Sequence, residues 1–295
     1  MIWLNSILFL SSCAVLSIVG PKLVKILAKI AKFLNWKEFV VAFFALAFVA
    51  SLPNFLVGIN SALQKIPQLS FGDIVGGNVI NLTLAVALAV LMGKGVLTAE
   101  SKTVQTSAAF CVLIAILPLV LVLDGMLGRI DGLLLLGIFI LYIAWLFSKK
   151  ERFKKVYNEK ETRPKKIVKS FKSFLANLAR TFLLLALALL ASHGIVTSAK
   201  SFSSHLGISL PVVGLLIVGL GNALPEIYFG VISSIKKQNW LILGDIMGAI
   251  IISATLVLGI VALIHPIPII NLAPMLVARI FLIISALFFF IIVND

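Results

Sequence analysis

Long apolar segments follow one another along the chain, and only short polar stretches separate most of them. A bilayer crossing needs about 20 predominantly apolar residues. The pattern predicts nine transmembrane helices, over residues 2–21, 37–63, 70–92, 104–123, 130–147, 174–190, 210–235, 240–264 and 274–293. The first helix is expected to continue to residue 32 with a cationic face, and the sixth to residue 204. Runs of this kind lack the two-residue alternation of a membrane β-barrel, so we expect an all-α polytopic membrane protein.

Composition and charge refine this prediction. With 61% hydrophobic residues, 12% charged residues and a mean hydropathy of +1.17, the chain is too apolar for a soluble domain. The net charge of +14 does not indicate nucleic acid as a partner, because 11 of the 25 lysines and arginines lie in residues 149–172 and most others flank apolar segments. The basic stretch 148–172 therefore divides the chain into halves 1–147 and 173–295. It is expected to lie in the cytoplasm beside anionic lipid.

Loop charges also predict an orientation. If the loops alternate sides and the N-terminus lies outside, 20 lysines and arginines fall in inside loops and four at outside positions. The positive-inside rule favours this arrangement. We therefore expect a multi-pass protein, of the cell membrane, with an outside N-terminus.

One polar stretch occurs twice. Residues 51–81 align with residues 223–253 at a constant offset of 172, so that Leu52-Pro53 matches Leu224-Pro225 and Gly72-Asp73-Ile74 matches Gly244-Asp245-Ile246. Five predicted helices separate the copies, so each helix of the second copy crosses the membrane in the opposite direction to its counterpart. Inverted-topology repeats of this kind are typical of secondary transporters. The second half supplies four helices, and no tenth is predicted.

The repeats place polar groups inside apolar segments, where such groups are costly unless they are functional. Pro53 and Pro225 are expected to break helices 2 and 7 at mid-membrane, which leaves the carbonyls of Val49 and Gly221 without helical donors. The side chains beside them all offer oxygen: Ser51, Asn54, Asp73, Asn78 and Asn81 in the first copy, and Asn222, Glu226, Asp245, Ser253 and Thr255 in the second. Oxygen ligands suit hard cations such as Ca²⁺, Mg²⁺ or Na⁺. Four glycines, Gly72, Gly76, Gly244 and Gly248, are expected to let helices approach closely.

These motifs resemble a known family. Ser51-Leu52-Pro53-Asn54 with 72–78, and Ala223-Leu224-Pro225-Glu226 with 244–249, are similar to the two α-repeats of the calcium/cation antiporter superfamily, to which sodium/calcium exchangers belong. The resemblance covers essentially the whole chain and implies cation antiport. It also implies an ion-binding Glu after the proline of each repeat. Here only Glu226 matches, and Asn54 makes the first repeat degenerate.

Further departures concern the expected ligands of that family. Ala223 replaces a hydroxyl residue, Ala50 and Asn222 replace threonines, and Gly77 and Ala249 replace serines, whereas Asn81 matches and Ser253 takes the equivalent place. Glu226 and Asn54 are the expected cation ligands at the centre. Asp73 and Asp245 either face the site or stabilise neighbouring backbone.

The expected function is antiport of Ca²⁺ or another hard cation against Na⁺ or H⁺, with no cofactor. Ca²⁺ affinity rises with the number of charged ligands, so a single carboxylate at the principal position also allows a monovalent cation/proton antiporter. A transport-inactive homologue that senses ions or binds a partner protein is the other alternative. An enzyme is not expected, because His193, His205 and His265 are isolated near helix ends. The oligomeric state is left open.

Overall fold

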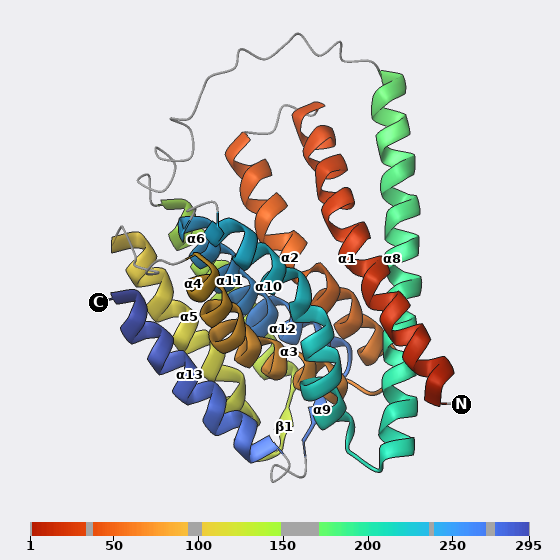
Figure 1. Cartoon of the computed structure of the whole chain (residues 1–295), viewed down its shortest axis with the longest axis vertical. Helices are drawn as coiled ribbons and strands as arrows, with labels where there is room; N and C mark the ends of the chain where they lie inside the picture. The colour runs from red at the N-terminus through yellow and green to blue at the C-terminus, as the bar shows by residue number, and fades with distance from the viewer. Residues whose placement is uncertain are drawn as a thin grey trace.

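The protein is almost entirely helical in the part that the computed structural model describes, residues 2–33, 38–93, 102–148, 171–235, 239–269 and 275–294 (Figure 1). The first half contains α1 (Ile2–Phe33), α2 (Glu38–Leu63), α3 (Gln68–Ile80), η1 (Asn81–Ala85), α4 (Val86–Gly93), α5 (Lys102–Leu121) and α6 (Arg129–Ser148). The second half contains α8 (Phe171–Leu206), α9 (Leu210–Val213), η3 (Gly214–Val218), α10 (Gly219–Ile235), α11 (Asn239–Ile251), η4 (Ile252–Val257), α12 (Leu258–Ile264) and α13 (Leu276–Asn294). Each predicted helix is found within a few residues of its expected bounds.

One small sheet lies at an end of the bundle. After the short 3₁₀ helix η2 (Val122–Asp124), strand β1 (Met126–Leu127) pairs antiparallel with β2 (Ile267–Pro268), so the loop after α5 meets the loop after α12. The backbone N–H of Ile269 also donates to the carbonyl of Gly125 at 2.8 Å. Gly125 has φ +92°, a left-handed conformation that glycine adopts without strain. These bonds tie the two halves together at this end.

Six helical segments of the described part are long and apolar enough to cross a membrane, and α9–α10 forms a seventh as a bent pair. Large apolar side chains cover the outward faces of α6, α8 and α13, including Ile140, Phe182 and Phe288, each more than 60% exposed. Exposed apolar surface on this scale is stable only against lipid. The protein is therefore an integral multi-pass membrane protein with an all-α fold, as predicted.

The duplication extends to every described helix of the second half. The offset of 172 that aligns the sequence repeats carries α2 onto α9–α10, α3–α4 onto α11–α12, α1 onto α8 and α5 onto α13, with bounds that agree within three residues. The contacts between helices follow the same correspondence between the two halves. α1 packs on its own counterpart α8, and α5 on α13. α3 packs on η3 and α10, while α11 and η4 pack on α2. The inverted-repeat prediction thus agrees with the architecture.

Both repeat prolines lie within helical segments. The helix around Pro225 is bent by 45° between Leu224 and Glu226. The helical backbone continues through Pro53 in α2 and through Pro225 in α10, so neither proline ends its helix. Proline removes one helical donor, but neighbouring groups in a packed membrane protein re-satisfy the freed carbonyl and keep the helix continuous.

Several predictions fall outside the described residues. Residues 149–170, which make up almost all of the basic linker, lie there, as do the side chains of residues 27–50. The division into halves, the cytoplasmic side of the linker, its contact with anionic lipid and the outside N-terminus therefore stay predictions.

Candidate cation-binding site

The two copies meet at a hydrogen bond between Asp73 on α3 and Asn222 on α10. The Asn222 Nδ2 atom donates to both carboxylate oxygens of Asp73, each at 3.0 Å. Asp73 is fully buried and Asn222 is 4% exposed. The sequence predicted that both residues belong to the site, but it did not predict the hydrogen bond between them. Ala50 stands where the first copy would carry the residue equivalent to Asn222, so the repeat itself gives no signal for this contact.

A second hydrogen bond joins the copies between α3 and η4. The Ser253 hydroxyl donates to Asn78 Oδ1 at 3.1 Å, and both residues are buried. Ser253 lies in the π-helical segment η4, and its counterpart Asn81 begins the π-helical segment η1. Such turns interrupt the regular α-helical ladder and are frequent at functional sites. Asn81 and Ser253 therefore lie in equivalent π-helical segments of the two copies.

Four of the predicted site residues each carry a buried oxygen that has no hydrogen-bond partner among the described groups. These atoms are Ser51 Oγ, Asn54 Oδ1, Asn81 Oδ1 and Glu226 Oε2. Their residues are only 2 to 7% exposed. An unsatisfied buried polar atom costs about 1–3 kcal/mol, so a cluster of them within one predicted site needs an explanation. A bound hard cation provides one, since it accepts lone pairs from carboxylate, amide and hydroxyl oxygens alike.

Negative charge gathers around Glu226 without compensation. Asp245 and Asp73 both lie close enough for their charges to act on Glu226, and no lysine or arginine in the described part offsets any of the three carboxylates. Asp245 on α11 is only half-buried. Within the described ranges, however, no three Asp, Glu, His or Cys side chains are placed to hold one metal ion. The three carboxylates therefore share an electrostatic environment but do not converge on a single point.

Close helix packing holds α3 in place against α9, η3 and α10. A Cβ atom added at Gly72 would lie 1.9 Å from the Pro211 carbonyl oxygen, and one at Gly76 would lie 2.1 Å from that of Leu215. Only glycine allows backbones to approach so closely. This confirms the packing prediction for the first copy. At the equivalent Gly244 and Gly248, no described atom lies within 4 Å of such a Cβ, so the predicted packing is not seen there.

The backbone carbonyls predicted as ligands receive no direct support. Val49 lies inside α2, which stays helical beyond it. Gly221 lies where α10 passes α1, and a Cβ there would be 3.1 Å from Cys13 Sγ and 3.2 Å from a ring atom of Phe9. The Thr255 hydroxyl donates to the Ile251 carbonyl within its own helical segment, which satisfies it locally. The roles of both carbonyls stay predictions.

Sequence reasoning missed a set of polar contacts and groups that were not among the predicted ligands. Asn60 on α2 donates to the Ser192 hydroxyl on α8, and Gln64 lies 3.3 Å from His193 Nδ1 on the same helix. Buried oxygens of Gln68, Ser70, Ser107 and Ser198 also have no described partner. The only signal for these residues was a polar side chain within an apolar segment, and it did not reveal the partner.

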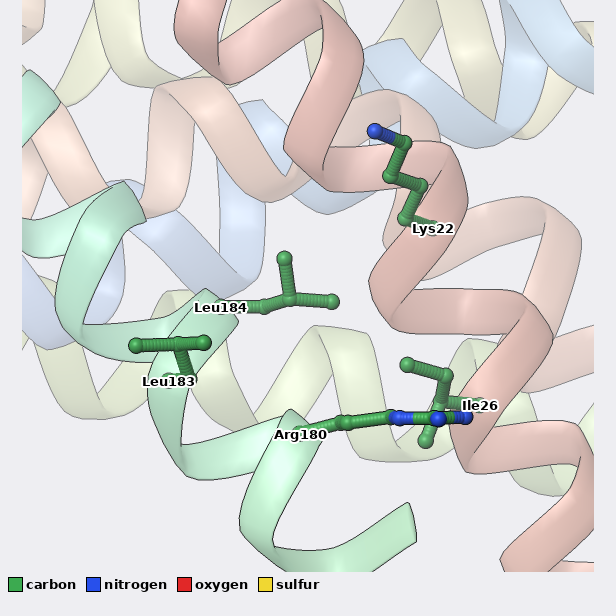
Figure 2. Close-up of a pocket in the computed structure, with 5 residues that line it drawn as sticks. All are labelled: Lys22, Ile26, Arg180, Leu183 and Leu184. Carbon is green, nitrogen blue, oxygen red and sulfur yellow. The ribbon is translucent and has the colours of Figure 1, made fainter. Parts of the chain in front are cut away.

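A groove lies apart from these residues, between α1 and α8. Its volume is about 320 Å³, and Lys22, Ile26, Arg180, Leu183 and Leu184 line it (Figure 2). None of these residues belongs to the repeats, and none carries an acidic group. The groove is therefore not the cation site.

Comparison with known proteins shows the family of this chain. The sequence profile of the sodium/calcium exchanger protein family matches residues 4–148 and 177–294. CaxA of Alkalimonas amylolytica, named as an antiporter, is 28% identical over 249 residues, which are 81% of this chain and 74% of that protein. The inner membrane protein YrbG of Escherichia coli is 28% identical over 226 residues, 73% of this chain and 66% of that protein.

Solved structures agree on the fold. The sodium-calcium exchanger NCX_Mj, soaked with Na⁺ and Sr²⁺, superposes with a TM-score of 0.59 and 24% identity, covering 99% of this chain and 90% of that one. The expected resemblance is thereby confirmed, and with it the assignment to transporters rather than enzymes. The chain belongs to the sodium/calcium exchanger protein family, a family of membrane cation antiporters.

Proposed function

We propose that the protein exchanges cations by binding them between the two repeats, with Glu226 and Asn54 as ligands at equivalent positions of the two copies. Ser51, Asn81 and Ser253 complete the oxygen set. The observation that carries the proposal is the group of buried oxygens without partners, which includes Glu226 Oε2 and Asn54 Oδ1. Glu226 also carries a negative charge that no described lysine or arginine neutralises.

The donor set favours a hard cation that needs little negative charge. Asn54 is neutral, and the described residues contain no set of three Asp, Glu, His or Cys side chains placed to hold one metal ion. Because Ca²⁺ affinity rises with the number of carboxylates, the centre suits a monovalent cation, or a divalent one bound weakly. The family relationship supports Na⁺ and Ca²⁺ as the first cations to test, with H⁺ as a coupling ion.

The repeats also provide a route to alternating access. Inverted repeats let one sequence plan form the inward-open and the outward-open state. The bend of 45° at Pro225 lies directly beside Glu226, so a change in this bend would move the ligand relative to α3. No cofactor is needed for such a mechanism.

The test is flux through the purified protein in lipid vesicles with imposed Na⁺, Ca²⁺ and pH gradients. Wild type should exchange at least one pair of these ions, and Glu226→Gln should abolish exchange because it removes the central charge. Asp124→Asn is a matched control, since Asp124 is an exposed carboxylate at the end of η2. Undiminished exchange by Glu226→Gln would contradict the proposal.

A transport-inactive ion sensor is the second candidate, and the neutral residues Asn54 and Ala223 favour it. Thermal unfolding with added cations and flux in vesicles together distinguish the two functions. A sensor would be stabilised against heat by a cation that binds the native state but would show no flux in vesicles. An antiporter would show both.

A further inference from the structure

The groove between α1 and α8 brings together two cations that lie far apart in the sequence. α1 and α8 pack along each other in opposite directions (Figure 1). Lys22 and Ile26 lie one helical turn apart on the α1 wall, and Arg180 lies one turn from Leu184 on the α8 wall. Figure 2 shows Arg180 reaching across the groove toward Ile26. The two cations therefore line one groove from opposite walls.

Both cations lie at the end of an apolar segment. The apolar part of α1, Trp3–Val19, ends just before Lys22. On α8, a continuous apolar run over residues 182–191 begins just after Arg180. Because the two helices run in opposite directions, these ends lie at the same membrane surface. The loop charges predict that this surface faces the cytoplasm, where the leaflet carries anionic lipid.

Neither cation is neutralised within the described part of the chain. No hydrogen bond or ion pair between described residues engages Lys22 or Arg180, and no Asp or Glu lines the groove. Both side chains are exposed. Two positive charges in one groove repel each other, so an anion between them is attracted by both. A guanidinium also pairs with a phosphate through two parallel hydrogen bonds.

Apolar side chains form the rest of the groove and continue beyond it. Leu183 is 62% exposed, and Ile26 and Leu184 are half-buried. Leu187 and Leu190 follow Leu183 on the same face of α8 and are also exposed. A free phosphate ion would leave this apolar surface uncovered, whereas a phospholipid carries acyl chains next to its phosphate. The groove therefore matches an anionic phospholipid in both charge and polarity.

The repeat symmetry provides an internal comparison. The offset of 172 that relates α1 to α8 carries Lys22 onto Gly194. It relates Arg180 to Leu8 in the same way. At this equivalent place the helices are in contact, since a Cβ atom at Gly194 would clash with Ser12 Oγ and lie 3.4 Å from Leu8 Cδ1. The helix pair can thus pack without cations and without a groove, so both are specific to one membrane surface.

We propose that the groove binds an anionic phospholipid, with the phosphate at Lys22 and Arg180 and an acyl chain along Leu183 and Leu184. The bound lipid joins α1 to α8, and thereby the first half of the chain to the second. The proposal does not depend on the proposed cation exchange, because the groove shares no residue with the candidate cation site.

Native mass spectrometry of the purified full-length protein, mixed with equal amounts of phosphatidylglycerol and phosphatidylcholine, tests the proposal. Wild type should retain phosphatidylglycerol preferentially. Lys22→Gln/Arg180→Gln should lose this preference, because it removes both charges and keeps polar side chains, and Lys22→Gln alone should reduce it at least several-fold. Lys65→Gln/Lys200→Gln is the matched control, since it removes two exposed lysines outside the groove and should keep the preference. Thermal unfolding checks that each variant is folded.

Two further measurements distinguish a lipid from a free anion. Leu183→Ser/Leu184→Ser introduces the residue type that α1 carries at the equivalent positions, Ser11 and Ser12, and should weaken retention of phosphatidylglycerol at least several-fold. Inorganic phosphate in excess should not displace the lipid; displacement would show a site for phosphate alone and overturn the commitment to a lipid. An unchanged preference in Lys22→Gln/Arg180→Gln, or an equal loss of preference in the matched control, would also overturn the proposal.

Discussion

Replacing Gly76 by alanine should destabilise the protein strongly, because it separates two helices that carry the site. The added Cβ would lie 2.1 Å from the Leu215 carbonyl oxygen, whereas ordinary contact begins at 3.4 Å. The backbones must therefore move apart by about 1.3 Å, the difference between these distances. Overpacking costs about 1–3 kcal/mol, and the upper end applies because the obstacle is backbone. Alanine regains about 1 kcal/mol of helix propensity, which leaves about 2 kcal/mol of destabilisation.

Gly77→Ala is the matched control, since it makes the same chemical change one residue further along α3. Its Cβ would lie 3.9 Å from the Gly219 carbonyl oxygen, an ordinary contact, so it should be neutral or stabilising by up to about 1 kcal/mol. Thermal unfolding in detergent should place Gly76→Ala about 4–8 °C below wild type, at about 2–4 °C per kcal/mol for a chain of this size, and Gly77→Ala at or above it. Equal melting temperatures for the two variants would refute the close packing of α3 on η3.

Three further changes test other contacts. Asn60→Ala should lower the stability by about 1 kcal/mol in thermal unfolding, because it removes the donor to Ser192 that ties α2 to α8; an unchanged melting temperature would contradict that tie. Arg279→Met should cost about 1.5–3 kcal/mol in the same assay, since the guanidinium donates to the Leu119 carbonyl and joins α13 to α5; a variant as stable as wild type would show that this bond is dispensable. Asn54→Glu should raise Ca²⁺ affinity relative to Na⁺ at least several-fold in competition binding, because it adds a second carboxylate at the centre; unchanged selectivity would place residue 54 away from the ion.

The architecture could be predicted from the sequence because two signals are long-range and redundant. Apolar segments of bilayer length predict helices regardless of local detail, and a single offset of 172 residues relates the elements of one half to those of the other. The same offset predicts that Asn81 and Ser253 take equivalent places, and both lie in π-helical segments. Such signals depend on the pattern and not on any single contact.

Individual contacts were harder to predict, because each depends on a partner outside the repeat pattern. Asp73 finds the amide of Asn222, although the first copy has Ala50 at the position equivalent to Asn222. Pro225 marks a bend of 45° in its helix, an angle that the sequence rule for proline does not predict. Local rules state what a proline or an aspartate can do, whereas packing against the neighbouring helix decides which possibility is realised.

The distribution of carboxylates over the repeats connects this asymmetry to selectivity. A divalent cation binds best where several carboxylates meet at one point. Here Asn54 removes one carboxylate from the centre, and Asp73 adds one from the same copy at a different place. Asp245 of the second copy acts on Glu226 as well, so the second copy supplies two carboxylates and the first copy one. Asp73 already accepts two hydrogen bonds from Asn222, which leaves Asn54 as the neutral member of the pair at equivalent positions. Moving one carboxylate from position 73 to position 54 keeps the total charge and places two carboxylates at the centre, so it should shift the preference toward Ca²⁺ and away from monovalent ions.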